Sequence, residues 1–287
     1  MLQRSTIQLL RFPFSLFLAP VFFFALSTLD NIHWGRTLLV FIILHVLVYP
    51  ASNGYNSYMD RDESPIGGIA NPMPPTRQLY FVTLLMDLLA IILGALVSAW
   101  FSIGICLFIL ASRSYSFRGI RLKKYPLIGY LTVIVFQGAL TFAIVYHGCS
   151  SQKLLTIPVL PMISASLLIG GFYPLTQIYQ HEADRKDGVL SISARLGYRG
   201  TFIFSAVVYS LAIGILGIYY TGLDQLPQFL LLTILLLPVL LFFLKWAISV
   251  WRDISAANFN NTMRLNVVAS ICTCIAFIAL IIWNQIE

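Results

Sequence analysis

The sequence is poor in charged residues, which make up 10% of its 287 residues. Soluble globular domains carry about 25% charged residues. Hydrophobic residues instead reach 59%, and the mean hydropathy is +0.85. Because so few charges cannot cover a surface that faces water, the composition predicts a protein embedded in lipid.

Cysteine is also scarce, and the four cysteines show neither a CxxC pair nor the Cys/His spacing of a metal site. We interpret them as packing residues. The first apolar stretch, which follows Arg4 and Arg11, lacks a cleavage site of small residues. We therefore expect this stretch to remain as the first helix and not to be removed as a signal peptide.

Long uncharged stretches are what the sequence has in abundance. A helix needs about 20 apolar residues to cross the hydrocarbon layer. We place nine spans near residues 9–28, 38–57, 79–97, 99–115, 126–146, 156–176, 201–221, 226–246 and 265–284. The sequence thus predicts an all-α, polytopic membrane bundle of nine transmembrane helices, with residues 1–287 as a single domain.

Positive charges are distributed unequally between the two sides of such a bundle. With the N-terminus inside, all of the 18 Lys and Arg residues except Arg36 and Lys153 fall on the inner side. Inner loops of membrane proteins carry such an excess, so we expect a cytoplasmic N-terminus. Short loops and few cysteines favour a bacterial inner membrane. The net charge of +7 does not indicate a nucleic-acid partner, because topology accounts for where the cations lie.

Acidic residues are few, and six of the 11 lie in two short patches. The patches are Asp60, Asp62 and Glu63, and Glu182, Asp184 and Asp187. Each patch ends a stripe of polar residues spaced by three or four, which places the stripe on one helix face. The stripes are His45, Tyr49, Ser52 or Asn53, Asn56 and Asp60 in the second span, and Tyr173, Gln177, Gln180 or His181, and Asp184 in the sixth.

Polar stripes in hydrocarbon normally face the interior of a bundle or a watery cavity. We therefore expect a central cavity, open to the cytoplasmic side, between the second and sixth spans. Carboxylate and amide oxygens on two facing helices suit Mg²⁺, which is often held by one or two carboxylates together with substrate phosphates. The predicted metal ligands are Asn56, Asp60, Gln180 and Asp184. Alternatively, the acids are solvated charges that end two helices.

A basic segment, residues 113–126, lies between the two acidic patches. Arg118, Arg121, Lys123 and Lys124 could hold a diphosphate that bridges to the metal. The alternative is a loop that only obeys the positive-inside rule. Residues 64–78 contain four prolines and two glycines, so they form either a lid over the phosphates or a plain connection.

Asp87 stands apart from both patches, inside the third span and without a basic residue near it in sequence. A carboxyl group at membrane depth must face protein or water. Two interpretations remain open, a structural hydrogen-bonded carboxyl group and a role in the substrate pocket.

These motifs, in this order, resemble the UbiA superfamily of intramembrane prenyltransferases over nearly the whole chain. That family has nine transmembrane helices, an NDxxDxxxD motif after the second and a DxxxD-type motif after the sixth. NSYMDRDES (residues 56–64) is similar to the first motif, and IYQHEADRKDGVLSISARLG (178–197) to the second. YSFRGIRLKKYPLIG (115–129) resembles the loop in which Tyr, Arg and Lys meet the diphosphate, and NPMPPTR (71–77) resembles the family's proline-containing loop.

Three positions depart from the family motifs. Ser57 and Ser64 stand for two aspartates of the first motif, and Gln180 stands for the leading aspartate of the second. We predict that nearby acids compensate for these replacements. The candidates are Asp62, Glu63 and Glu182.

The resemblance implies Mg²⁺-dependent transfer of a prenyl group from a prenyl diphosphate to an aromatic or other lipophilic acceptor, with a quinone precursor favoured. It implies catalytic roles for Asp60, Asp184 and Lys123. The implied diphosphate-binding residues are Tyr115, Arg118, Arg121, Lys123, Lys124 and Arg185. An aromatic pocket would protect an allylic cation from water, and its candidate tyrosines are Tyr49, Tyr55, Tyr58, Tyr115, Tyr173 and Tyr179.

Two other functions remain as alternatives. The first is a transporter or lipid-handling protein that uses the same cavity without chemistry. The second is a degenerate family member kept as a binding or assembly partner.

Overall fold

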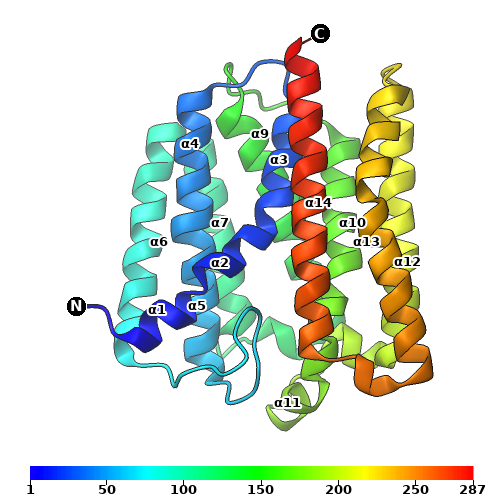
Figure 1. Cartoon of the computed structure of the whole chain (residues 1–287). Helices are drawn as coiled ribbons and strands as arrows, with labels where there is room; N and C mark the ends of the chain where they lie inside the picture. Colours follow the sequence, from blue (N-terminus) through cyan, green and yellow to red (C-terminus); the bar gives the residue numbers. More distant parts are fainter. Residues whose placement is uncertain (287) are drawn as a thin grey trace.

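The computed structural model describes residues 1–286 and confirms an all-helical bundle. Nine helices in this range are long and apolar enough to span a membrane: Arg4–Ser27, Trp34–Asp60, Arg77–Val97, Ala99–Ser116, Pro126–Cys149, Val159–Lys186, Ile192–Thr221, Leu226–Arg252 and Phe259–Ile286. Apart from two isolated bridges, these residues contain no β-structure. Figure 1 shows the spans side by side, with α11 (His181–Lys186) at one end and the last residues of α14 (Phe259–Ile286) at the other.

The largest errors in the predicted boundaries lie in the last four spans. The sixth continues to Lys186 and does not end near residue 176. The seventh, α12 (Ile192–Thr221), begins at Ile192 and not near residue 201, and it is kinked at Gly197, where φ is 72°. The eighth, α13 (Leu226–Arg252), and the ninth, α14, extend six residues beyond their predicted inner ends, 246 and 265. Hydropathy detects only the part of a helix that lies in lipid, so the polar first or last turns were missed.

Four spans are assembled from several helical pieces. The first contains α1 (Arg4–Leu10), α2 (Phe12–Ser15), η1 (Leu16–Leu18) and α3 (Ala19–Ser27), and the second contains α4 (Trp34–Ile42), the π-helical η2 (Ile43–Val48) and α5 (Tyr49–Asp60). The fifth contains α8 (Pro126–Val133), the π-helical η4 (Ile134–Leu140) and α9 (Thr141–Cys149), and the sixth contains α10 (Val159–Gln177), the 3-10 turn η5 (Ile178–Gln180) and α11. π segments in helices occur frequently at functional sites.

Local sequence explains two of these interruptions. Pro50 follows the π segment of the second span, and proline supplies no N–H to the helix and clashes with the preceding turn. In the first span, Arg11 adopts a left-handed conformation with φ of 50°, and Pro13 follows at the start of α2.

The bundle closes because the first and last spans pack together. Phe24 stacks on Phe277 with ring centroids 4.5 Å apart, and Phe142 of α9 meets Phe24 edge-on at 5.2 Å. The side-chain amide of Asn284 also donates to the carbonyl of Ser27 at 3.0 Å. Leucine and isoleucine side chains cover the outside, for example Leu88, Ile92 and Leu96 on α6 (Arg77–Val97). This apolar exterior matches an integral, multi-pass membrane protein.

Asp87 is paired inside the bundle and does not line the cavity. Arg113 of α7 (Ala99–Ser116) donates from Nε to the Asp87 carboxylate at 2.9 Å and from Nη1 to Thr83 at 3.2 Å. Its guanidinium also lies 3.9 Å from the ring centroid of Tyr55. The structural interpretation of Asp87 therefore holds, with a partner 26 residues away in sequence.

We predict that Gly138→Ala destabilises the bundle by about 1–3 kcal/mol. A Cβ at Gly138 would lie 2.5 Å from the Cα of Ser166 on α10, and a backbone atom cannot move away cheaply. Thermal unfolding in one detergent measures the effect. Gly214→Ala is the matched control, because a Cβ there meets nothing within 4 Å. Equal melting temperatures for the two variants would contradict the close approach of η4 and α10.

Candidate functional site

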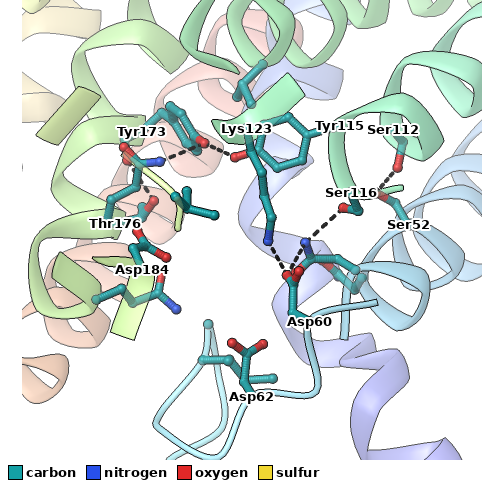
Figure 2. Close-up of a pocket in the computed structure, with 18 of the residues that line it drawn as sticks. Ser52, Asp60, Asp62, Ser112, Tyr115, Ser116, Lys123, Tyr173, Thr176 and Asp184 are labelled. Carbon is teal, nitrogen blue, oxygen red and sulfur yellow. Dashed lines mark hydrogen bonds and ion pairs between the residues drawn. The ribbon is translucent and has the colours of Figure 1, made fainter. Parts of the chain in front are cut away.

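A polar cavity of about 210 Å³ opens between the first, second, fourth, fifth and sixth spans. Its polar lining consists of Arg11, Ser52, Asn53, Asn56, Asp60, Asp62, Ser112, Tyr115, Ser116, Lys123, Thr132, Gln137, Tyr173, Thr176, Gln177, Tyr179, Gln180, Asp184 and Asp187. Figure 2 shows Asp60 and Asp184 on opposite sides of this space, with Tyr115 and Tyr173 together at another part of its wall. The two acidic patches thus meet at one cavity, as their stripes predict.

Asp60 lies at the end of α5, with a side chain that is only 4% exposed. Lys123 forms an ion pair with it, and the Asn56 amide donates to the same carboxylate oxygen, Oδ2, at 2.9 Å. The Asn56 amide also donates to Ser116 at 2.9 Å, which ties α5 to α7. The other oxygen, Oδ1, is buried and makes no hydrogen bond, and Nη2 of Arg121 lies 3.6 Å from it. A buried carboxylate oxygen without a donor is a ready position for a cation or an incoming donor.

The second patch is carried by η5 and α11. Gln180 and Asp184 both line the cavity, and Gln180 donates to the Pro65 carbonyl of the 64–78 loop at 3.5 Å. All four predicted metal ligands therefore surround one space. Ile66 and Gly67 of the same loop also line it, so the loop covers part of the cavity wall.

The predicted cations divide into two groups. Lys123 lines the cavity, and Arg121 lies beside it, paired with Asp187 and close to Asp60. Arg118 is half exposed and donates to the Met59 carbonyl at 2.8 Å. Lys124 and Arg185 have exposed side chains and do not line the cavity. The structure thus separates these last two from the expected diphosphate site.

Of the three acids expected to compensate for the altered motif, one reaches the cavity. Asp62 lines it, whereas Glu63 and Glu182 are exposed and lie outside the lining. Ser57 is buried and Ser64 half-buried, and neither belongs to the lining.

A chain of polar side chains runs along the deeper wall. The hydroxyl of Tyr115 hydrogen-bonds that of Tyr173, and Gln177 donates to Tyr173 at 2.8 Å. Tyr179 also lines the cavity. The other three tyrosines expected in the aromatic pocket, Tyr49, Tyr55 and Tyr58, lie outside the lining. His45 is likewise outside the lining. Its Nδ1 contacts the Ser15 carbonyl at 3.1 Å, and this contact joins the second span to the first.

Sequence reasoning assigned no site role to two charged residues that line the cavity. Arg11 is buried and donates to the Asn53 carbonyl at 3.0 Å. The position of Arg11 inside an apolar span indicates a role in the cavity, because charged residues at membrane depth normally face a cavity or the bundle interior. Asp187 was recognised only as part of the acidic patch, although it follows Asp184 by three residues and so shares its helix face.

The oxygen-rich donor set fits a hard cation such as Mg²⁺ that shares its ligands with a phosphate group. Within residues 1–286, no three His, Cys, Asp or Glu side chains are grouped closely enough to hold a metal ion on their own. The Oδ1 of Asp60, which makes no hydrogen bond, is the atom best placed to begin such a site. Phosphate oxygens would have to complete the coordination.

Asp62 carries a marked electrostatic perturbation. Burial raises the pKa of Asp62 from its usual 3.8 to about 6, repulsion from Asp60 adds to the increase, and Lys123 and Arg11 oppose it. Between about pH 4 and pH 6 the folded chain therefore keeps a proton that the unfolded chain has lost. Because the folded chain binds this extra proton, the free energy of unfolding decreases as pH rises through that window.

We predict that Asp62→Asn stabilises the protein above pH 7, by about 2 kcal/mol, and loses this advantage near pH 4. The amide mimics the neutral acid, so it removes the cost of the buried charge only where the acid is ionised. Melting temperatures in EDTA, measured for both proteins between pH 4 and 8, provide the comparison. Glu63→Gln, at an exposed neighbour, is the control. A difference that does not vary with pH would rule out the raised pKa.

Protein families and solved structures similar to this chain identify its relatives. The family model described as "UbiA prenyltransferase family" matches residues 16–268. No curated protein sequence matches the chain. A UbiA homolog from Archaeoglobus fulgidus, solved with DMAPP and Mg²⁺, superposes with a TM-score of 0.73 at 17% identity, covering 96% of this chain and 99% of that one.

Two further solved structures share the fold. A UbiA homolog from Aeropyrum pernix K1 gives a TM-score of 0.70 at 19% identity, covering 94% of this chain and 98% of that one. A digeranylgeranylglyceryl phosphate synthase gives 0.63 at 16% identity, covering 99% of each chain. At such identities the structures establish the common fold, and the family match over residues 16–268 establishes the relationship. The chain belongs to the UbiA prenyltransferase family.

Proposed function

We propose that the protein transfers a prenyl group from a prenyl diphosphate to a lipophilic acceptor within the membrane, with Mg²⁺ as cofactor and an aromatic quinone precursor as the favoured acceptor. One observation carries the proposal. Asp60 is buried at the cavity with one oxygen paired to Lys123 and the other without a hydrogen bond. The A. fulgidus homolog, solved with DMAPP and Mg²⁺, supports the same ligands for this cavity.

In this proposal the chain holds the leaving group at the polar mouth of the cavity. Asp60, Asp184, Asn56 and Gln180 supply oxygen ligands, and Lys123 balances charge beside them. When bound, Mg²⁺ would neutralise the negative charge that develops on the diphosphate as the allylic C–O bond breaks. Preorganised charges of this kind are usually the largest contribution to catalysis.

The deeper wall would receive the prenyl group. Phe108 and Phe136 line this cavity together with Tyr115 and Tyr173. Aromatic faces attract cations, and a water-poor pocket protects a carbocation from hydrolysis. The diphosphate leaves with the electron pair of the C–O bond, a carbon of the acceptor forms the new bond to the prenyl carbon, and the proton displaced from that acceptor carbon passes to the released diphosphate.

Asp62 supports a competent rather than a degenerate site. It adds a carboxylate to the cavity beside Asp60 and Asp184. Of the three replaced positions, Ser57 and Ser64 lie outside the lining, and only Gln180 lies within it. The interrupted helices of four spans are a feature shared with transporters. A transporter using this cavity would bind a prenyl diphosphate and release it unchanged, so product formation separates the two functions.

We predict that Asp184→Asn lowers the rate of prenyl transfer by about 100-fold or more, because it removes a charge that stabilises the metal-bound leaving group. The measurement is Mg²⁺-dependent formation of prenylated product by purified protein in lipid nanodiscs, with several prenyl diphosphates and aromatic acceptors. Glu182→Gln makes the same chemical change on the same helix, at an exposed position outside the cavity, and should retain activity.

Three results would weigh against this proposal. Product that forms equally well in EDTA would show that the reaction does not require Mg²⁺. Equal losses in the Asp184→Asn and Glu182→Gln variants would indicate a general effect of charge. Binding of prenyl diphosphate without product from any acceptor would favour the transporter or the degenerate site.

We further propose that the cavity end of the bundle, and the N-terminus, face the cytoplasm of a bacterial cell. The cations near this end, such as Arg118 and Lys124, support this orientation. A cysteine at Lys124 should be shielded from an impermeant thiol reagent in intact cells, and one at Ser151 should be labelled; both side chains are exposed in the bundle. The opposite labelling pattern would invert the proposed orientation.

A further inference from the structure

Two of the cations expected to bind a diphosphate already hold an anion that belongs to the chain. Arg121 donates from Nη1 to the backbone carbonyl of Asp187 at 3.0 Å and from Nη2 to its carboxylate. Arg118 lies 3.7 Å from the other carboxylate oxygen of Asp187. A single residue at the end of α11 therefore joins the two arginines of the loop between α7 and α8.

In this arrangement the terminal N–H donors of Arg121 are not free to bind a substrate. Both of its terminal nitrogens are engaged with Asp187, and Nη2 also lies 3.6 Å from Asp60. Its Nε is buried without a hydrogen-bond partner. Guanidinium groups bind phosphate through a planar fork of N–H donors, and here that fork faces Asp187.

Among Asp60, Arg121 and Asp187, Asp187 has the side chain that can move away from the others. Its side chain is 35% exposed, whereas those of Arg121 and Asp60 are 11% and 4% exposed. It lines the cavity, and the next residue, Gly188, has a positive φ of 68° and open space where a Cβ would lie. Movement of the Asp187 carboxylate toward solvent therefore meets little packing resistance.

We propose that Asp187 occupies the diphosphate position on Arg121 and Arg118 until substrate displaces it. The inference rests on the proposed function and assigns Asp187 a role opposite to that of the other cavity acids. Asp60 and Asp184 favour substrate binding through the metal, whereas Asp187 competes with the substrate for the arginines. The affinity for diphosphate is reduced by the fraction of protein in which the arginines are occupied.

The other role open to Asp187 is to orient the arginines for the substrate. An orienting carboxylate would hold one edge of the guanidinium and leave a second edge facing the cavity. Asp187 instead engages both terminal nitrogens of Arg121, the more buried of the two arginines. The two roles predict opposite changes in affinity when the carboxylate is removed.

Binding of inorganic diphosphate in EDTA, measured by calorimetry on the full chain in nanodiscs, tests the competition without the metal. Asp187→Asn should bind about fivefold more tightly than the unaltered protein, as expected for loss of a partly exposed ion pair. Asp187→Glu keeps the charge and should stay close to the unaltered protein. Glu182→Gln removes an exposed acid from the same helix and should change the affinity less than twofold.

Unchanged or weaker binding by Asp187→Asn would overturn the inference, as would equal tightening by Glu182→Gln. A second measurement needs no variant. Diphosphate should increase amide hydrogen exchange in residues 185–190 of the unaltered protein, because it releases the contact with Arg121, and slower exchange would contradict displacement. If the unaltered protein forms prenylated product but these results fail, only this inference falls; if it binds no diphosphate with or without Mg²⁺, the proposed function falls with it.

Discussion

The ion pair between Asp60 and Lys123 is the interaction on which the arrangement of the site depends. A carboxylate that is 4% exposed at the end of a membrane helix requires a cation or a set of hydrogen bonds beside it. Lys123 lies 63 residues further along the chain, so the loop after α7 must fold back over the end of α5. That return brings Arg118 and Arg121 to the cavity mouth, and the Asn56 bond to Ser116 fixes the spacing of the two helices.

The cavity combines two environments that the chemistry requires together. Its mouth is polar and contains both acids and cations, among them the paired Asp60 and Lys123. Its deeper wall carries aromatic rings, among them Tyr115 and Tyr173, whose hydroxyl groups bond each other and so do not need water. The family motifs are altered at Ser57, Ser64 and Gln180; the two serines lie outside the lining, whereas Gln180 and Asp62 lie within it.

Much of this site follows from helical periodicity. The spacing of Asn56 and Asp60, and of Gln180 and Asp184, predicts that they share a cavity, because residues four apart lie on one helix face. The same rule, extended to the residue that caps α11, selects Asp187 and excludes Glu182, two residues before Asp184. The exposed positions of Lys124 and Arg185 could not be predicted, since their loop conformations depend on tertiary ion pairs. Hydropathy also gives no indication of the π segments, because a π turn changes hydrogen bonding without changing composition.

The contact between the first and last spans has a consequence for biogenesis. Phe24 stacks on Phe277, about 250 residues later in the chain. At synthesis rates of about 5–20 residues per second, the first span waits in the membrane for more than ten seconds before its partner is made. During that interval its core-facing side is not yet covered by the ninth span. Insertion factors or neighbouring lipids must shield that side, so the slow step in maturation is expected to be the arrival of the ninth span rather than the insertion of any single helix.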